Sequence, residues 1–153
     1  MCIRDRLIGS EIGAMGMGIP AGIAAALRFP DRQVYSIVGD GGALMTGSEL
    51  ATAVAYKAKI RVIVANNNHY GTIRYHQEVH FPTRDHYATN LVNPDFAKYG
   101  ESFGLKCFTI YNTEQILPTI KSAMEVDGPS LIEFKMSLEL NTSTTTISQL
   151  QTN

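Results

Sequence analysis

Apolar positions along the chain follow two alternating patterns. Short runs rich in β-branched residues predict four buried strands, which span residues 33–38, 61–65, 106–111 and 130–135. Segments with apolar residues on one helical face predict four helices, near residues 21–29, 48–58, 94–103 and 113–126. This alternation predicts an α/β domain of three layers, with a mainly parallel sheet flanked by helices.

Local signals predict where individual helices begin and end. Thr46 and Glu49 have the spacing of a capping box, which predicts the start of the second helix. Asn93, a proline and Asp95 in succession predict the start of the third helix, and Gly104 predicts its end.

Three segments lie outside this pattern. Residues 68–75 are predicted to form a loop. Residues 1–6, MCIRDR, look like a translated sequencing-adapter leader and are expected to be extraneous to the fold. Residues 138–153 are rich in Ser and Thr and lack a core pattern, so we expect a polar tail that is extended or disordered. The domain is therefore expected to span residues 7–137.

Composition narrows the classes of function. The chain has 153 residues, 44% of them hydrophobic, which suits one domain with a real core. Its formal net charge is −1, without long runs of like charge, which argues against nucleic-acid or membrane partners and favours a small ligand. No apolar stretch approaches the roughly 20 residues needed to cross a bilayer. Two cysteines, Cys2 and Cys107, are too few and too far apart in sequence for a disulfide framework or a zinc site, which favours a reducing compartment. Together with the lack of a long apolar stretch, this leads us to expect a soluble cytoplasmic protein.

Polar clusters follow two of the predicted strands. Gly39-Asp40-Gly41-Gly42 comes after the first strand and Asn66-Asn67-Asn68 after the second. Ligands of open α/β sheets gather at the carboxyl ends of strands. A carboxylate, an amide oxygen and a loop carbonyl suit Mg²⁺ or Ca²⁺ rather than zinc. The glycines would let a diphosphate approach their amides, at the positive end of the next helix. These features predict a metal-diphosphate cradle.

The two clusters also resemble a known motif. Asp40 and Asn67 are 27 residues apart, and GDG followed by NN at this distance resembles the binding motif of thiamine-diphosphate-dependent enzymes. That superfamily includes acetolactate synthase, pyruvate oxidase and benzoylformate decarboxylase. The segments GAMGMGIPAGIAAAL, NPDFAKYGESFGLK and GPSLIEFK resemble the acetolactate synthase group, so the resemblance extends from about Gly9 to Met136.

The resemblance implies a role for several residues. Asp40 and Asn67 match the side-chain ligands of Mg²⁺, and the backbone carbonyl of His69 matches the third protein ligand. Met15 matches the apolar residue that wedges between the two rings of thiamine diphosphate. The carbonyl of Gly13 matches the group that orients the amino group of the cofactor's pyrimidine ring.

The resemblance further implies decarboxylation and carboligation of 2-keto acids, by a transferase or lyase that uses thiamine diphosphate and Mg²⁺. The acid that protonates the pyrimidine ring belongs, in this family, to an amino-terminal domain of a neighbouring subunit. We therefore expect this chain to be a C-terminal fragment, inactive alone, of a protein that forms a homodimer or homotetramer.

The expected substrate pocket contains Thr72 and His76. Acetohydroxyacid synthases that favour a larger acceptor keto acid have Trp nine residues after the second Asn, whereas His76 occupies this position and the chain has no Trp. This departure argues against a role in branched-chain biosynthesis. Decarboxylase, carboligase and oxidase activities stay open.

Two alternative functions also stay open. Gly16, Gly18 and Ala21 satisfy the GxGxxA fingerprint of a nicotinamide-dependent oxidoreductase, but no full strand precedes them and the Asn cluster is then unexplained. A non-catalytic relative of the same fold is the other alternative. The presence of Asp40 and Asn67 argues against it, because a decayed site need not keep metal ligands.

Overall fold

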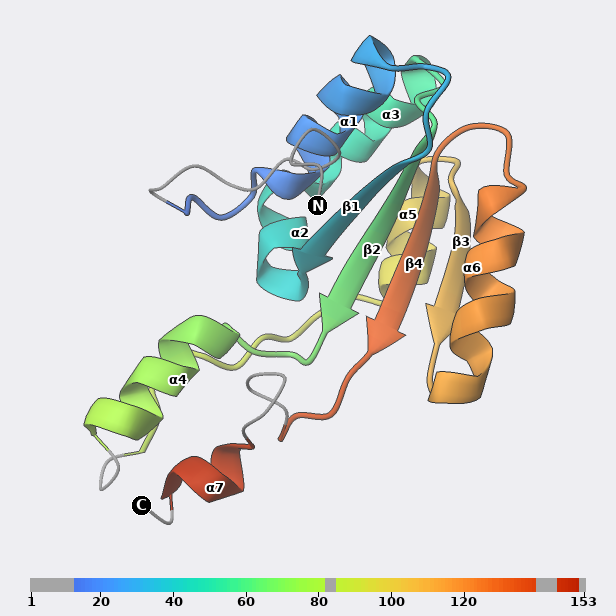
Figure 1. The fold of residues 1–153 in the computed structure, drawn as a ribbon. Helices are drawn as coiled ribbons and strands as arrows, with labels where there is room; N and C mark the ends of the chain where they lie inside the picture. The colour runs from blue at the N-terminus through green and yellow to red at the C-terminus, as the bar shows by residue number, and fades with distance from the viewer. Residues whose placement is uncertain (1–12, 82–84, 140–145, 152–153) are drawn as a thin grey trace, which may run out of the picture.

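The computed structural model describes residues 13–81, 85–139 and 146–151, in which helices and strands alternate (Figure 1). The four strands are β1 (Val34–Gly39), β2 (Ile60–Asn66), β3 (Lys106–Ile110) and β4 (Ser130–Lys135). The helices are α1 (Gly18–Arg28), α2 (Asp40–Thr46), α3 (Leu50–Ala55), α4 (Gly71–His80), α5 (Phe96–Ser102), α6 (Ile116–Met124) and α7 (Ile147–Gln151), with short 3₁₀ turns at Gly47–Glu49 and Thr113–Gln115.

The strands form one parallel sheet in the order β1-β2-β4-β3. All four predicted strands are therefore confirmed, as is the parallel arrangement. In the pairing of β1 with β2, Gly39 lies opposite Ala65. The residues that follow each strand consequently emerge at one edge of the sheet, the lower edge in Figure 1.

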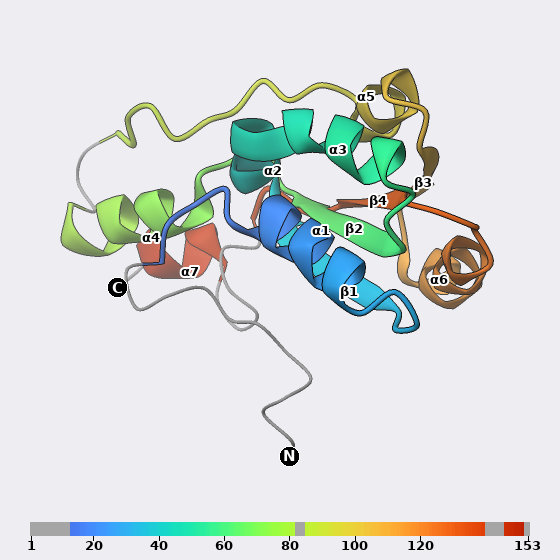
Figure 2. The same ribbon diagram turned by 90° about the horizontal axis from the view of Figure 1, so that it is seen from above.

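Helices cover the sheet from both sides, which confirms the three-layer architecture (Figure 2). On one side α1, α2, α3 and α5 pack against β2 and β4 through a core that includes Ile23, Leu50, Val62 and Phe96. On the other side α6 packs on β3 and β4 in a smaller cluster around Ile132. The helices that cover the sheet therefore bury apolar side chains against it, as their sequence patterns predict.

A buried arginine connects β2 to the end of α6. Arg61 is 1% exposed, and burial lowers the pKa of its guanidinium. The guanidinium donates to the carbonyl of Met124, the last residue of α6, at 3.3 Å, and to the carbonyls of Val126, at 2.7 Å, and Gly128 just beyond the helix. The last carbonyls of a helix lack intrahelical partners, so Arg61 satisfies this end of α6 and fixes it against the sheet.

Two predicted helical boundaries are wrong. Of residues 68–75, predicted as a loop, only 68–70 precede a helix, because α4 begins at Gly71. The segment after Thr46 is not one helix from a capping box: the Thr46 hydroxyl donates instead to the carbonyl of Gly16 at 2.8 Å, and a 3₁₀ turn at Gly47–Glu49 separates α2 from α3. The tertiary hydrogen bond at Thr46 replaces the local cap.

Other predicted ends are confirmed or refined. Gly104, with φ of 92°, ends α5 in the left-handed region, as predicted. The N-cap of α5 is Asp95, whose side chain accepts from the amide of Lys98 at 3.0 Å, and not Asn93. The carboxyl-terminal segment is not wholly extended, because it contains α7, in which Ile147 is buried.

Residues 1–6, with the predicted leader, lie outside the described residues, as does most of the segment between Glu139 and α7. Within the part of the chain that the structure describes, no helix combines the length and apolar character that crossing a membrane requires.

The close approach of α1 to the sheet generates a prediction. A Cβ added at Gly22 would lie 2.6 Å from Ile60 Cδ1 and 2.9 Å from Ser36 Cβ. We expect Gly22→Ala to lower the free energy of unfolding by about 1–3 kcal/mol, because overpacking outweighs the better helix propensity of alanine. Chemical denaturation of the variant measures this loss.

Gly39→Ala is the matched control, because a Cβ at Gly39 meets no atom within 4 Å and its φ is −73°. The control should change the free energy of unfolding by less than about 0.5 kcal/mol. Equal stability of the two variants would show that α1 can shift away from the sheet at no cost.

Candidate functional site

A groove of about 1120 Å³ runs along β1 and continues past its carboxyl end to the start of α2. It brings together most of the residues that the sequence predicts for a cofactor site. The lining includes Gly13, Met15, Gly39, Asp40, Gly41, Gly42, His69 and Thr72. These residues come from three parts of the chain: the segment before α1, the junction of β1 with α2, and the segment from the end of β2 to the first turn of α4.

Asp40 is the only carboxylate among the residues that line this groove. It is the first residue of α2 and is 2% exposed. Its Oδ1 accepts from the amide of Gly41 at 2.8 Å, and its Oδ2 accepts from the side-chain nitrogen of Asn93 at 2.7 Å. These bonds hold the charged group in one orientation and compensate in part for its burial.

The asparagine run forms a tight turn after β2. Asn66 is 2% exposed, and its Oδ1 accepts from the amide of Asn68 at 3.1 Å. Asn67 is partly exposed, and its Oδ1 accepts from the amide of His69 at 3.2 Å. Asn68 has φ of 58°, a left-handed conformation that Asn tolerates better than most residues. The turn thus directs three amide side chains to different neighbours.

The direction of the His69 carbonyl follows from a short antiparallel bridge between His69 and Asn90. The amide of Leu91 donates to the carbonyl of Asn68 at 2.8 Å, and the amide of Tyr70 donates to the carbonyl of Thr89 at 2.9 Å. Because these bonds flank His69, its own amide and carbonyl point away from Asn90. The carbonyl is thereby kept out of the bridge and available to another ligand.

The glycines at the start of α2 differ in their surroundings. A Cβ at Gly41 would lie 2.5 Å from a ring carbon of Tyr70 and 3.3 Å from Met15 Cε. Gly41 therefore lets Tyr70 and Met15 close over the turn. A Cβ at Gly42 would meet only the amide nitrogen of Gly16, at 3.8 Å, so the backbone of Gly42 is open to an approaching group. Met15 itself is 50% exposed and is not a core residue.

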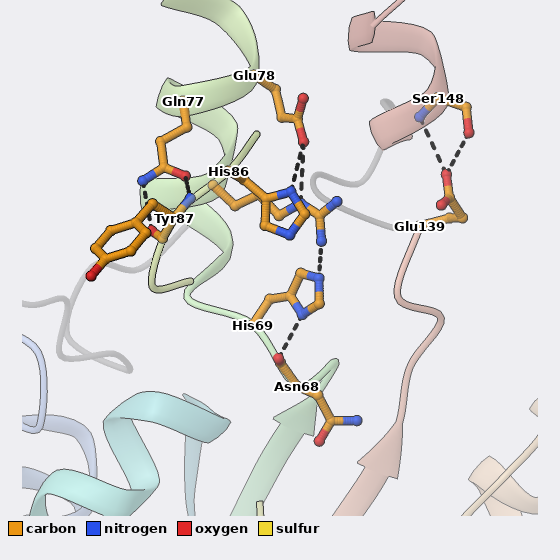
Figure 3. Close-up of polar contacts among 9 residues, drawn as sticks. Asn68, His69, Gln77, Glu78, His86, Tyr87, Glu139 and Ser148 are labelled. Atoms are coloured by element: carbon orange, nitrogen blue, oxygen red, sulfur yellow. Dashed lines mark hydrogen bonds and ion pairs between the residues drawn. The ribbon is translucent and has the colours of Figure 1, made fainter. Parts of the chain in front are cut away.

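A buried polar cluster joins His69 to α4 (Figure 3). Arg74 donates to Nε2 of His69, so His69 carries its proton on Nδ1 and donates to the carbonyl of Asn68. Arg74 also donates to Glu78 at 3.3 Å, and Glu78 is 4% exposed. His86 lies 4.0 Å from the same Glu78 oxygen. The cluster fixes the start of α4 relative to the turn that carries the His69 carbonyl.

The predicted substrate-pocket residues both lie on α4. Thr72, in the first turn, is exposed and lines the groove. His76 lies one turn further on, is exposed, and stacks on His80 with the ring centroids 5.8 Å apart. It is not among the residues that line the groove. Its role in the pocket stays a prediction.

Two residues of the site, Asn93 and Glu133, are not assigned to it by the sequence analysis. Asn93 donates to Asp40 and to Asn66, the latter at 2.8 Å. Asn66 donates in turn to Glu133 at 2.6 Å, and Glu133 is completely buried. The one signal in the sequence for this network is the carboxylate of Glu133, which lies between apolar residues of a predicted buried strand and therefore needs a polar partner.

Cys107 is free but poorly suited to nucleophilic chemistry. Burial, followed by the nearby carboxylate of Glu101, raises the pKa of its thiol to about 12. The thiol therefore stays protonated at neutral pH.

Comparison with known proteins defines the family. The family described as "Thiamine pyrophosphate enzyme, C-terminal TPP binding domain" matches residues 4–134. A thiamine pyrophosphate-containing protein, YdaP, of Bacillus subtilis (strain 168) is 36% identical over 136 residues, which cover 89% of this chain and 23% of that protein. The acetolactate synthase large subunit of Lactococcus lactis is 36% identical over 134 residues, or 88% of this chain and 23% of that subunit.

A solved structure of a thiamine diphosphate-dependent enzyme supports the same family. The thiamine diphosphate-dependent 4-hydroxybenzoylformate decarboxylase of Rhodococcus jostii RHA1 superposes with a TM-score of 0.77 at 32% identity, over 82% of this chain and 24% of that one. The chain thus spans about a quarter of the length of these relatives. It belongs to the thiamine pyrophosphate enzyme family and corresponds to the C-terminal, cofactor-binding domain. This family excludes the alternative of a nicotinamide-dinucleotide-binding oxidoreductase domain.

The buried cluster on α4 generates a prediction. We expect Arg74→Met and Glu78→Gln each to lower the free energy of unfolding by about 2–4 kcal/mol, because each removes one charge of the Arg74–Glu78 ion pair while the opposite charge stays largely buried. The double variant should lose less than the sum, with a coupling of about 1–3 kcal/mol. Chemical denaturation of the unsubstituted protein, the two single variants and the double variant gives the four free energies of unfolding from which this coupling is calculated.

The exposed pair of Lys98 and Asp95 provides the control. Their closest atoms are 3.7 Å apart and their side chains are 81% and 48% exposed. A cycle of Lys98→Met with Asp95→Asn should give a coupling below about 0.5 kcal/mol. Equal coupling in the two cycles would contradict a special role for the buried cluster.

Proposed function

We propose that this chain is the diphosphate-binding domain of an enzyme that uses thiamine diphosphate and Mg²⁺ to cleave or join carbon–carbon bonds next to the carbonyl of a 2-keto acid. One observation carries the proposal: the buried, oriented carboxylate of Asp40 lines the groove, directly after the carboxyl end of β1. A buried carboxylate in such a position suits a cation.

The donor chemistry fits Mg²⁺. Asp40 offers an anionic oxygen, Asn67 a partly exposed amide oxygen, and His69 a carbonyl directed away from its bridge partner. Three oxygen donors would leave positions of an octahedral ion for phosphate oxygens and water. We therefore assign the metal to Asp40, Asn67 and the His69 carbonyl.

The diphosphate would lie against the backbone at the start of α2. Gly42 is open to an approaching group, and Gly39 has no atom near its missing side chain. Because α2 has only seven residues before the chain turns into a 3₁₀ segment, its dipole contributes little. We assign diphosphate binding chiefly to the metal and to these open amides.

Met15 and Gly13 would hold the rings of the cofactor. Met15 projects over Gly41, with half of its side chain exposed to the groove. Gly13 has φ of 62° and lines the same groove, so its carbonyl can approach a ligand without steric hindrance from a side chain. When bound, thiamine diphosphate supplies the electron sink for bond cleavage next to a carbonyl.

The substrate class is inferred from the relatives. One is named as an acetolactate synthase and another as a 4-hydroxybenzoylformate decarboxylase. These names support a 2-keto acid substrate, with a transferase or a lyase activity. Thr72 at the groove supports contact between α4 and the substrate, and His76 stays a prediction.

The rest of the enzyme is expected to lie in the part of the relatives that this chain does not span. We propose that the 153-residue chain is one domain of a longer protein that forms a homodimer or homotetramer, and that another domain supplies the acid for the pyrimidine ring. The chain alone should therefore not decarboxylate pyruvate.

The metal assignment predicts the behaviour of Asp40→Ala in the full-length protein. We expect its affinity for thiamine diphosphate in Mg²⁺ to fall by more than roughly 100-fold, because the only anionic ligand is lost. Equilibrium dialysis against thiamine diphosphate measures the change.

Asp31→Ala is the control, since Asp31 is an exposed aspartate that does not line the groove. The affinity of the Asp31→Ala protein for thiamine diphosphate should match that of the unsubstituted protein. Unchanged affinity of the Asp40→Ala protein for thiamine diphosphate would contradict the assignment of Asp40 as a metal ligand. If the unsubstituted full-length protein does not bind the cofactor, the result would support the alternative of a non-catalytic relative.

The ring assignment predicts a different result for Met15→Ala. Affinity for the cofactor should change by less than about threefold, while exchange of the thiazolium C2 proton slows roughly 10- to 100-fold, because only the geometry between the two rings is disturbed. Hydrogen–deuterium exchange followed by NMR of the bound cofactor measures the rate. Met124→Ala, at an exposed methionine on α6, should leave the rate unchanged. Loss of binding with normal exchange would assign Met15 to packing alone.

A further inference from the structure

The side-chain amide of Asn93 lies at the centre of three oxygens. Its Nδ2 is 2.7 Å from Asp40 Oδ2, 2.8 Å from Asn66 Oδ1 and 3.1 Å from Asn68 Oδ1. Asn93 comes from the segment before α5, so it reaches the junctions of both β1 and β2 from a distant part of the chain. One nitrogen thus connects the carboxylate of Asp40 to the asparagine turn.

The nitrogen and the oxygen of the Asn93 side-chain amide differ in their hydrogen bonding. An amide nitrogen carries two hydrogens, and here it faces three acceptors. The amide oxygen, Asn93 Oδ1, is buried and accepts no hydrogen bond from the residues that the structure describes. The reversed orientation would bring this oxygen against the Asp40 carboxylate. The surrounding oxygens therefore select the nitrogen, at the cost of an unsatisfied acceptor.

A second chain of bonds holds Asn66 in the orientation that Asn93 requires. Asn66 Nδ2 donates to Glu133 Oε1 at 2.6 Å, and Lys135 Nζ lies 2.7 Å from the same oxygen. Because Asn66 must present its nitrogen to Glu133, its oxygen faces Asn93. The order Asp40, Asn93, Asn66, Glu133 is thus a continuous network across the ends of β1, β2 and β4.

We propose that Asn93 is a positioning residue for the cation site. It holds Asp40 Oδ2 and the turn at Asn66 and Asn68 together before any cation arrives, so the cation need not order them on binding. The gain is one of preorganisation: the entropy of fixing the carboxylate and the turn is lost on folding and not on binding. This inference rests on the proposed function, since it concerns how well Asp40 is prepared to receive Mg²⁺.

The test uses the full-length protein with Asn93→Ala. The Mg²⁺ concentration at the midpoint of thiamine diphosphate binding should rise roughly ten- to hundredfold, which corresponds to losing a hydrogen bond to a charged group. Isothermal titration at several Mg²⁺ concentrations gives the midpoint, and thermal unfolding without Mg²⁺ gives the change in stability.

Asn112→Ala is the matched control. Asn112 is also an asparagine at the start of a helical segment, where its Oδ1 accepts from the amide of Gln115 at 3.2 Å, and it does not line the groove. The control should lower the melting temperature without moving the Mg²⁺ midpoint. A midpoint for Asn93→Ala within twofold of the unsubstituted protein would overturn the proposal, because Asn93 would then act only on stability.

A second variant covers the case in which Asn93→Ala does not fold. Asn93→Leu keeps the side-chain size and removes the donor, so it should raise the midpoint to the same extent, and an unchanged midpoint would again overturn the proposal. Asp40→Ala separates the two claims. If Asp40→Ala does not weaken binding of thiamine diphosphate, the proposed function fails. If Asp40→Ala abolishes this binding and Asn93→Leu does not weaken it, only the role of Asn93 fails.

Discussion

The parallel pairing of β1 with β2 is the constraint on which the rest of the site depends. Because Gly39 lies opposite Ala65, the next residues, Asp40 and Asn66, lie at the same level, where β1 has ended and β2 ends. Their side chains are then close enough for one amide, that of Asn93, to bond both. The apolar core beneath them fixes this register, since a shift by one residue would turn every buried side chain of a strand to the other face.

Most of the architecture could be predicted because it rests on local patterns. The apolar runs of β2 and β4 and the helical stripes of α1 and α6 are each visible in a short window of sequence. The residues at the ends of β1 and β2 could be assigned because carboxyl ends of parallel strands share an edge. The structure brings the predicted Gly13, Met15 and Asp40 into one groove.

The features that were missed have partners far away in the sequence. The sequence predicts a loop in place of the first half of α4, because this helix buries Arg74 and Glu78 and has no apolar stripe that would reveal its periodicity. Asn93 was interpreted as a helix start, a local role, whereas its side chain serves Asp40, 53 residues earlier. Buried polar networks of this kind depend on the tertiary structure that brings their members together.

The most direct test of a cation held between Asp40, Asn67 and the His69 carbonyl is crystallographic. Crystals of the full-length protein grown with thiamine diphosphate and Mn²⁺ in place of Mg²⁺ would locate the cation by anomalous scattering. We predict a peak at roughly 2.0–2.2 Å from an Asp40 carboxylate oxygen, Asn67 Oδ1 and the His69 carbonyl oxygen. A fully occupied peak elsewhere, or cofactor bound in the groove without any peak beside Asp40, would contradict this account.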